Sequence, residues 1–118
     1  AALYLNSNSI GDDGAGALAE ALKSNKKLNE LHLSENSIGP DGAKSLAQIL
    51  KVNTHLKSLN LQLNPIGDDG AQSLAEAIKI NPMLTSLHLH GNSVSEAASQ
   101  AIKQLLQKNQ MSDEPAEL

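Results

Sequence analysis

The sequence predicts an α/β solenoid, in which short parallel strands and helices alternate along a stack of similar units. One observation behind this prediction is a period of 28 residues that runs along nearly the whole chain. Another is that each unit has one half with alternating apolar residues and one half with apolar residues at helical spacing. The third is composition: Tyr4 is the single aromatic residue and there is no cysteine, so Leu, Ile, Val and Ala must fill the core.

The period divides the chain into four units and a tail. Aligned columns of leucine, isoleucine or valine, and asparagine carry it. These columns are Leu3, Leu31, Leu59 and Leu87; Leu5, Leu33, Leu61 and Leu89; Ile10, Ile38, Ile66 and Val94; Asn8, Asn36, Asn64 and Asn92; and Asn25, Asn53, Asn81 and Asn109. The units are expected at about 1–27, 28–55, 56–83 and 84–110, the first truncated and the last a C-terminal capping repeat, followed by a polar tail at 111–118.

The first half of each unit is expected to form a strand. In the second unit Leu31 and Leu33 alternate with polar neighbours, which is typical of a short strand with one buried face. The later half, residues 39–51, is expected to form a helix, because its apolar residues recur three and four positions apart. Pro40 suits the first turn of this helix, where a missing N–H costs nothing.

Polar residues mark the helix ends. Aspartates at the helix starts place anions at the positive end of the helix dipole, and Ser95 is expected to cap the last helix. The aspartates are Asp12, Asp13, Asp41, Asp68 and Asp69. Asn25, Asn53 and Asn81 are expected to be the left-handed residues that end the helices. The Asn36 column is expected to turn inward and to satisfy the loop backbone.

The two ends of the array differ. The first unit keeps its apolar residues with no polar shield, so we expect a further repeat or a cap before residue 1. In the last unit Ser99 and Lys103 replace the small residues of earlier units, which favours a helix with no neighbour beyond it.

The repeated unit from Leu28 to Asn53 reads L-x-x-L-x-L-x-x-N-x-I-G-x-x-G-A-x-x-L-A-x-x-L-x-x-N and resembles the leucine-rich repeat of the ribonuclease-inhibitor type. This type also occurs in NOD-like receptors and in the Ran GTPase-activating protein. The resemblance covers residues 1 to about 110. It implies a leucine-rich-repeat solenoid, a segment of a right-handed α/β horseshoe, with parallel strands on the concave face, helices on the convex face, and partner binding on the strand side.

With the leucines inward, the intervening strand residues are expected to face solvent and to form the binding surface. Leu63 stands out in it, because its equivalents Ser7, Glu35 and Gly91 are polar or glycine. The candidate residues are Tyr4, Asn6, Glu30, His32, Glu35, Asn60, Gln62, Leu63, His88 and His90.

Composition argues against other classes of function. The net charge is −4 and there is no Arg, so we expect no nucleic-acid or anionic-membrane partner. His88 and His90 resemble half of a metal site, but Gln62 is a poor third ligand, and we expect no metal. The sequence offers no nucleophile with a plausible base and no complete phosphate loop. We therefore expect no catalysis, no cofactor and no small-molecule substrate.

These observations predict a non-catalytic protein-interaction scaffold, the C-terminal part of a longer leucine-rich-repeat domain, that binds a protein on its concave face. The alternatives are a regulator of an enzyme, as the resemblance to a GTPase-activating protein suggests, and the sensor segment of a NOD-like receptor or a microbial effector. The lack of cysteine favours a cytoplasmic location.

Overall fold

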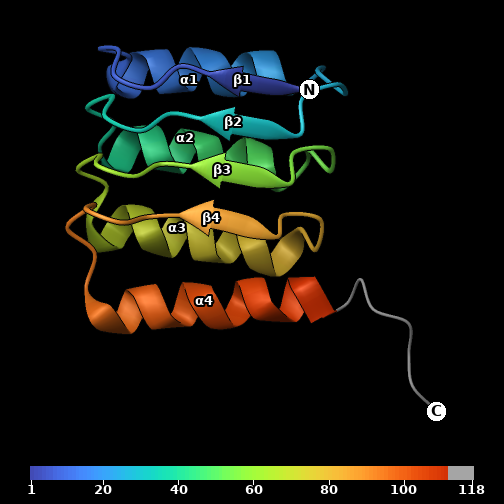
Figure 1. Ribbon diagram of the computed structural model, residues 1–118, viewed down its shortest axis with the longest axis vertical. Coiled ribbons are helices and arrows are strands. Elements are labelled where there is room, and N and C mark those ends of the chain that lie inside the picture. Colours follow the sequence, from blue (N-terminus) through green and yellow to red (C-terminus); the bar gives the residue numbers. More distant parts are fainter. Residues whose placement is uncertain (112–118) are drawn as a thin grey trace.

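The computed structural model describes residues 1–111, in which strands and helices alternate along the chain (Figure 1). The elements are β1 (Ala2–Tyr4), α1 (Gly11–Leu22), β2 (Glu30–His32), α2 (Pro40–Leu50), β3 (Ser58–Asn60), α3 (Gly67–Ile80), β4 (Ser86–His88) and α4 (Glu96–Met111). Met111, the first residue assigned to the tail, is the last residue of α4. The rest of the predicted tail lies outside the described residues.

The strands form one parallel sheet in the order of the sequence, β1-β2-β3-β4. Each strand pairs with the next in the register of the repeat, so that Leu3 lies beside Leu31, Leu31 beside Leu59, and Leu59 beside Leu87. The helices form a second layer behind the sheet (Figure 1). The predicted α/β solenoid, with strands on one side and helices on the other, is confirmed.

The core fills the space between these two layers. Leu31, Leu33, Ile38, Leu46 and Leu50, which come from both halves of the second unit, are each at most 1% exposed. Neighbouring helices are close enough to require small residues: a Cβ added at Gly42 in α2 would lie 3.2 Å from Cβ of Ala15 in α1 and 2.7 Å from Cγ2 of Ile38. Slim aliphatic side chains therefore suffice to fill the interior.

The inward-facing asparagines satisfy the loop backbone, as predicted. Asn64 donates from its side-chain amide to the carbonyl of Leu33 (2.9 Å) and to that of Leu61 (3.0 Å). Its Oδ1 accepts from the backbone N–H groups of Asn36 (2.8 Å) and Ile38 (3.1 Å) in the preceding unit. One buried side chain therefore connects two units through groups that the sheet does not reach.

The predicted left-handed conformation of Asn25, Asn53 and Asn81 is wrong. Asn81 is extended, with φ −106° and ψ 100°, and neither Asn25 nor Asn53 has a positive φ. Asn53 and Asn81 instead act through their side chains. Asn53 donates to the carbonyl of Leu22 (2.9 Å) in the preceding unit, and its Oδ1 accepts from the backbone N–H of Leu56 (3.0 Å). A second asparagine ladder thus replaces the expected helix-ending turn.

The aspartates at the helix starts act between units as well as within them. Oδ1 of Asp12, in the first turn of α1, accepts from the backbone N–H groups of Gly39 (2.6 Å) and Gly42 (3.0 Å) at the start of α2. Oδ1 of Asp68 in α3 accepts from the backbone N–H of Ser95 (2.7 Å), which precedes α4. Ser95 also caps α4 as predicted, because its Oγ accepts from the backbone N–H of Ala98 (3.2 Å).

The two ends of the stack differ in exposure. Leu3 in β1 is 38% exposed, whereas its equivalents Leu31 and Leu59 are buried. At the other end Ser99 is half-buried and Lys103 is exposed on α4. Among the described residues, no helix is both long enough and apolar enough to cross a membrane.

Candidate functional site

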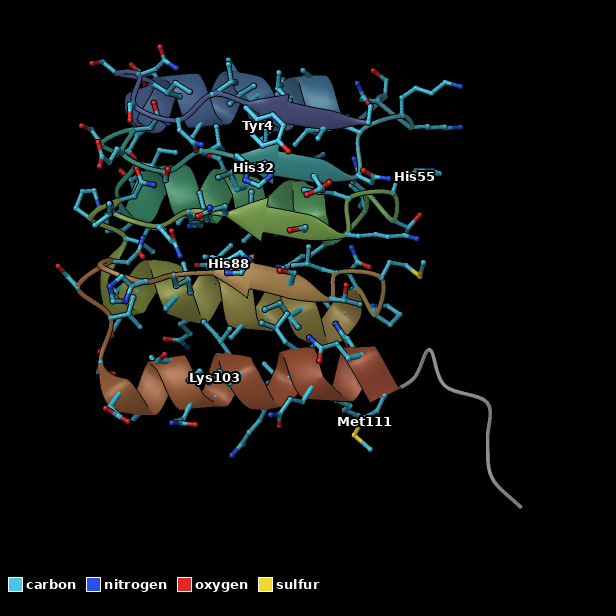
Figure 2. The ribbon with its side chains drawn as sticks, viewed as in Figure 1. Tyr4, His32, His55, His88, Lys103 and Met111 are labelled. Atoms are coloured by element: carbon cyan, nitrogen blue, oxygen red, sulfur yellow. The ribbon has the colours of Figure 1, made fainter. Side chains whose placement is uncertain are left out.

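The outward-facing strand residues form the surface that the sequence predicts as a binding site. The parallel register places Tyr4 beside His32, His32 beside Asn60, and Asn60 beside His88. We call this surface, with the residues two and three positions after each strand, the strand face. Figure 2 shows Tyr4, His32 and His88 on the sheet side of the molecule, away from the helices.

Two rings pack together at the N-terminal end of the strand face. The rings of Tyr4 and His32 are stacked, with centroids 4.3 Å apart and planes 12° apart. Nε2 of His32 lies 3.5 Å from Oε1 of Glu30 and makes no hydrogen bond within the described residues. Tyr4 remains 65% exposed, so this pair offers an aromatic surface with a carboxylate beside it.

The histidines at the other end of the strand face are exposed. Nε2 of His88 lies 3.1 Å from Oγ of Ser86, a neighbour on the same strand. Among residues 1–111, no group of three or more His, Cys, Asp or Glu side chains is placed to hold a metal ion. What His88 and His90 offer here is exposed hydrogen-bonding capacity.

Some of the predicted site residues are engaged with the backbone. Oδ1 of Asn6 accepts from the backbone N–H of Ser34 (2.9 Å), and Oδ1 of Asn60 accepts from that of Gln62 (3.0 Å). Glu35, by contrast, is exposed and accepts only a long hydrogen bond (3.3 Å) from the Ser7 hydroxyl. The two asparagines therefore keep only their amide N–H groups free of these bonds.

Leu63 is the large apolar residue at a left-handed position of the strand face that Ser7 and Glu35 occupy in the earlier units. Its side chain is 50% exposed, and its φ is +61°, in the left-handed region that leucine rarely adopts. Its backbone N–H donates to the carbonyl of His90 (2.9 Å), which holds the loop in register. The side chain lies over Gly91, where an added Cβ would be 2.6 Å from Cδ2 of Leu63. The structure thus presents an apolar side chain on a loop whose backbone is held by a hydrogen bond to the next unit.

Sequence reasoning missed a hollow beside the open edge of β4. It has a volume of about 280 Å³ and lies between β4 and α4. Gln62, His88 and His90 of the predicted site lie around it, with apolar residues Leu87, Leu89, Ile102 and Leu106 and with Ser99 and Lys103 of α4. The signal in the sequence was the change from small residues to Ser99 and Lys103, which by itself indicates only a missing neighbour.

The parallel sheet, the helix layer and the 28-residue register together define a solenoid repeat protein. The family model described as "Leucine Rich repeat" matches residues 2–19, 24–47 and 52–75, more than half of the chain. The chain belongs to the leucine-rich-repeat family. No curated protein matches it.

The chain is similar to many solved structures, of which two are described here. One, described as "Leiomodin-1 Actin-Binding Site 2 (ABS2)", is 20% identical, with a TM-score of 0.77 over 95% of this chain and 82% of that one. The other, described as "Structural Genomics of Caenorhabditis elegans: tropomodulin C-terminal domain", is 15% identical, with a TM-score of 0.60 over 95% of this chain and 85% of that one. At these identities the similarity shows the fold.

Proposed function

We propose that the chain is a non-catalytic protein-interaction module that binds a protein partner through the strand face. The observation that carries the proposal is Leu63, a half-exposed leucine in a left-handed backbone conformation. The side chain contributes little to the core because half of it is in water. A protein bound at the strand face would bury the exposed half of the Leu63 side chain.

Leu63 is a large apolar residue at a left-handed position that Ser7, Glu35 and Gly91 occupy in the other units. A non-glycine residue in the left-handed region costs about 1 kcal/mol relative to glycine, and the equivalent position in the last unit is Gly91. A sequence position that keeps an unfavourable residue on the surface is a candidate for function. Leu63 is therefore favoured as the apolar centre of the partner contact.

The surroundings of Leu63 suit the rim of a protein interface. Gln62 and His90 lie beside it and are polar, and Glu35 occupies the equivalent position one unit earlier. Interfaces commonly have an apolar centre and a polar rim. Tyr4 is the single residue of the types that dominate binding hot spots, so we expect a modest affinity from this segment alone.

The chemistry of the face supports binding over catalysis. Oγ of Ser86 lies 3.1 Å from Nε2 of His88, but within residues 1–111 no carboxylate lies within 4.0 Å of His88 to orient its ring. The carboxylate that pairs with a histidine is that of Glu30, beside His32. We place the protein in the cytoplasm because a chain without cysteine suits a reducing compartment and needs no disulfide. One of the two similar structures is described as an actin-binding site, so actin is the first partner to assay.

The test is a pull-down with the intact protein, repeated with Leu63→Asp, Tyr4→Ala and His88→Ala. Leu63→Asp should reduce partner recovery at least tenfold, because it places a charge at the buried centre of the contact. Ala17→Asp, which adds the same charge at an exposed position of α1, should leave recovery unchanged. Unchanged binding in all three strand-face variants would show that the partner contacts another surface.

A further inference from the structure

The charges of this acidic protein are segregated between two edges. Most lysines lie near the helix C-termini or in the turns that lead from helix to strand, and of the nine lysines only Lys44 and Lys103 lie elsewhere. The acids at the helix starts lie at the opposite edge. Figure 1 shows the helix-to-strand turns on the right, where α4 ends, and Figure 2 places His55 and Met111 on that same side. We call this side the basic edge; its lysines are Lys23, Lys26, Lys27, Lys51, Lys57, Lys79 and Lys108.

Helix dipoles account for only part of the basic edge. Lys79 and Lys108 lie in the last turns of α3 and α4, where a cation is favourable. The last turns of α1 and α2 contain no basic residue. Lys26, Lys27 and Lys57 lie beyond these helices, in the turns, where the dipole effect has fallen off.

These three lysines also lack acidic partners. Within residues 1–111, Lys23 is the lysine with a carboxylate within 4.0 Å, paired with Glu20 at 2.9 Å on an exposed surface. Lys26, Lys27 and Lys57 make no such pair in that part of the chain. Cations gathered on adjacent turns repel one another, so the fold gains nothing from placing them together.

The turns enclose a hollow between these lysines. They stack through backbone bonds from the N–H of Lys57 to the carbonyl of Asn29 (2.8 Å) and from the N–H of Thr85 to the carbonyl of Lys57 (3.0 Å). The hollow has a volume of about 630 Å³, which is within the usual range for ligand sites. Its lining is Lys26, Lys27, Asn29, Thr54, His55, Lys57 and Met83.

Apolar side chains are also exposed along the basic edge, one of them in the lining of this hollow. Met83, which lines the hollow, is 38% exposed, and Val52 and Ile80 at the ends of α2 and α3 are more than half exposed. Met111, the last residue of α4, is also exposed. A hollow with cations around it and a methionine in its lining suits a ligand that is both anionic and apolar.

We propose that this hollow is a second docking site, which binds a short acidic segment of a partner polypeptide with an apolar side chain among its carboxylates. The carboxylates would pair with Lys26, Lys27 and Lys57, and the apolar side chain would pack on Met83. Thr54 and Asn29 supply hydrogen bonds to the peptide backbone. This site lies in the turns at the basic edge. It is therefore separate from the strand face, which is formed by outward-facing side chains of the sheet.

A peptide fits these observations better than a nucleic acid or a membrane. The basic edge has no Arg, Tyr, Trp or Phe, and His55 is the single ring in the lining of the hollow, so the edge offers little that would stack on bases or anchor at a lipid interface. The whole chain carries a net charge of −4, which opposes binding to an extended polyanion. Asp113, Glu114 and Glu117 contribute to this net negative charge. A local cluster of cations in a hollow therefore suits a short acidic segment.

The experiment is a nuclear magnetic resonance titration of the full chain with a synthetic peptide of about ten residues, mostly Glu with two Leu. Backbone shift changes should be confined to the turns that hold Lys27, His55 and Met83. Lys27→Glu/Lys57→Glu should weaken the peptide affinity at least tenfold. The matched control Lys44→Glu/Lys103→Glu makes the same change in net charge on α2 and α4, and it should weaken affinity less than about threefold. Raising NaCl from about 0.05 M to 0.5 M should weaken binding strongly.

Several outcomes would overturn the proposal. Equal weakening of peptide affinity in both double variants would mean that only net charge matters. Undetectable peptide binding would also overturn the proposal, as would shift changes located on the strand face. Tighter binding to anionic vesicles or to single-stranded DNA than to the peptide would assign the basic edge to a membrane or a nucleic acid. A tenfold gain in peptide affinity in Asp113→Asn/Glu114→Gln/Glu117→Gln would identify the chain's own C-terminal residues as the occupant. Met83→Ser should lower affinity without unfolding the protein, and no effect would remove the apolar part of the proposal.

Discussion

At the scale of single residues, the third position after each strand has a left-handed backbone in every unit. Ser7, Glu35, Leu63 and Gly91 occupy it, with φ between 57° and 74°. The backbone conformation is the same at all four positions. The units therefore differ at this position only in the side chain that they expose to solvent. Leu63 presents an apolar group, and its side chain is supported from one side by the bare backbone of Gly91.

This support gives a prediction for Gly91→Ala. The new methyl group should cost about 1 kcal/mol through its positive φ and should displace the Leu63 side chain, whose flexible end it meets. Gly67→Ala is the control, because Gly67 has φ +70° but open space around it, and it should cost a similar amount without moving Leu63. Urea unfolding measures the stabilities, and the methyl resonances of Leu63 report its displacement. Unchanged Leu63 resonances in Gly91→Ala would contradict the proposed support.

A second prediction concerns Asn64 in the inward-facing ladder. Asn64→Ala removes hydrogen bonds to buried backbone groups of two units and should lower the free energy of unfolding by about 3–5 kcal/mol. Asn8→Ala is the matched control, because Asn8 is exposed and donates to carbonyls of its own unit alone, and it should cost about 1 kcal/mol or less. Equal costs in urea unfolding would mean that the ladder does not connect the units.

The inward asparagine column can be predicted from the sequence, whereas the left-handed column cannot, and the reason is physical. The inward asparagines repeat in all four units, so their shared role is visible as a column of one residue type. The left-handed column holds Ser, Glu, Leu and Gly, of which only Gly favours that conformation. Propensity therefore gave no signal for the left-handed column after the strands. At the helix ends it predicted left-handed asparagines, whereas Asn53 and Asn81 act there through side-chain hydrogen bonds.

At the scale of helices and strands, the starts of the helices alternate along the array. Repeats one and three carry Asp12 and Asp68, whose carboxylates reach the start of the following helix. At the equivalent position the second unit has Pro40, which has no carboxylate to extend toward α3. The fold thus couples α1 to α2 and α3 to α4 by an interaction that the 28-residue period alone does not reveal.

Asp12→Ala tests this coupling. Gly39, which precedes α2, has no side chain to cap the helix, so loss of the Asp12 carboxylate leaves the N–H groups of Gly39 and Gly42 without it. We expect the free energy of unfolding to fall by about 1–2 kcal/mol. Asp13→Ala removes an exposed neighbouring charge in the same first turn of α1 and should cost less than about 0.5 kcal/mol. If urea unfolding gives the same small loss of stability for both variants, the aspartates act on the helix dipole and not through direct hydrogen bonds to the next helix.

At the scale of the whole molecule, the strand order, the register and the layering could all be predicted, because a repeat converts one local pattern into the architecture of the stack. The residues of the predicted site lie on the strand side for the same reason, since alternation fixes which strand residues point outward. Net charge, by contrast, was misleading about the surface. A sum of −4 contains no information on position, and the segregation of Lys26, Lys27 and Lys57 from the aspartates appears only when helix-to-strand turns stack on one edge.

The same linear architecture determines how stability is distributed. Each helix packs chiefly against the helices before and after it, and each strand pairs with its neighbours in the sheet. Leu61→Ala creates a cavity at a fully buried side chain that has a unit on each side of it in the stack, and it should cost about 2–5 kcal/mol. Leu106→Ala in α4 makes the same change where the chain has packed neighbours on one side among the described residues, and its site is 8% exposed. It should cost about half as much, because the last helix can shift or fray to close the cavity.

Denaturant titration compares the free energies of unfolding of the two variants. Hydrogen exchange should show faster opening of α4 in Leu106→Ala while β2 and β3 stay protected. Equal losses, with uniform exchange along the array, would mean that the repeats unfold as one rigid block.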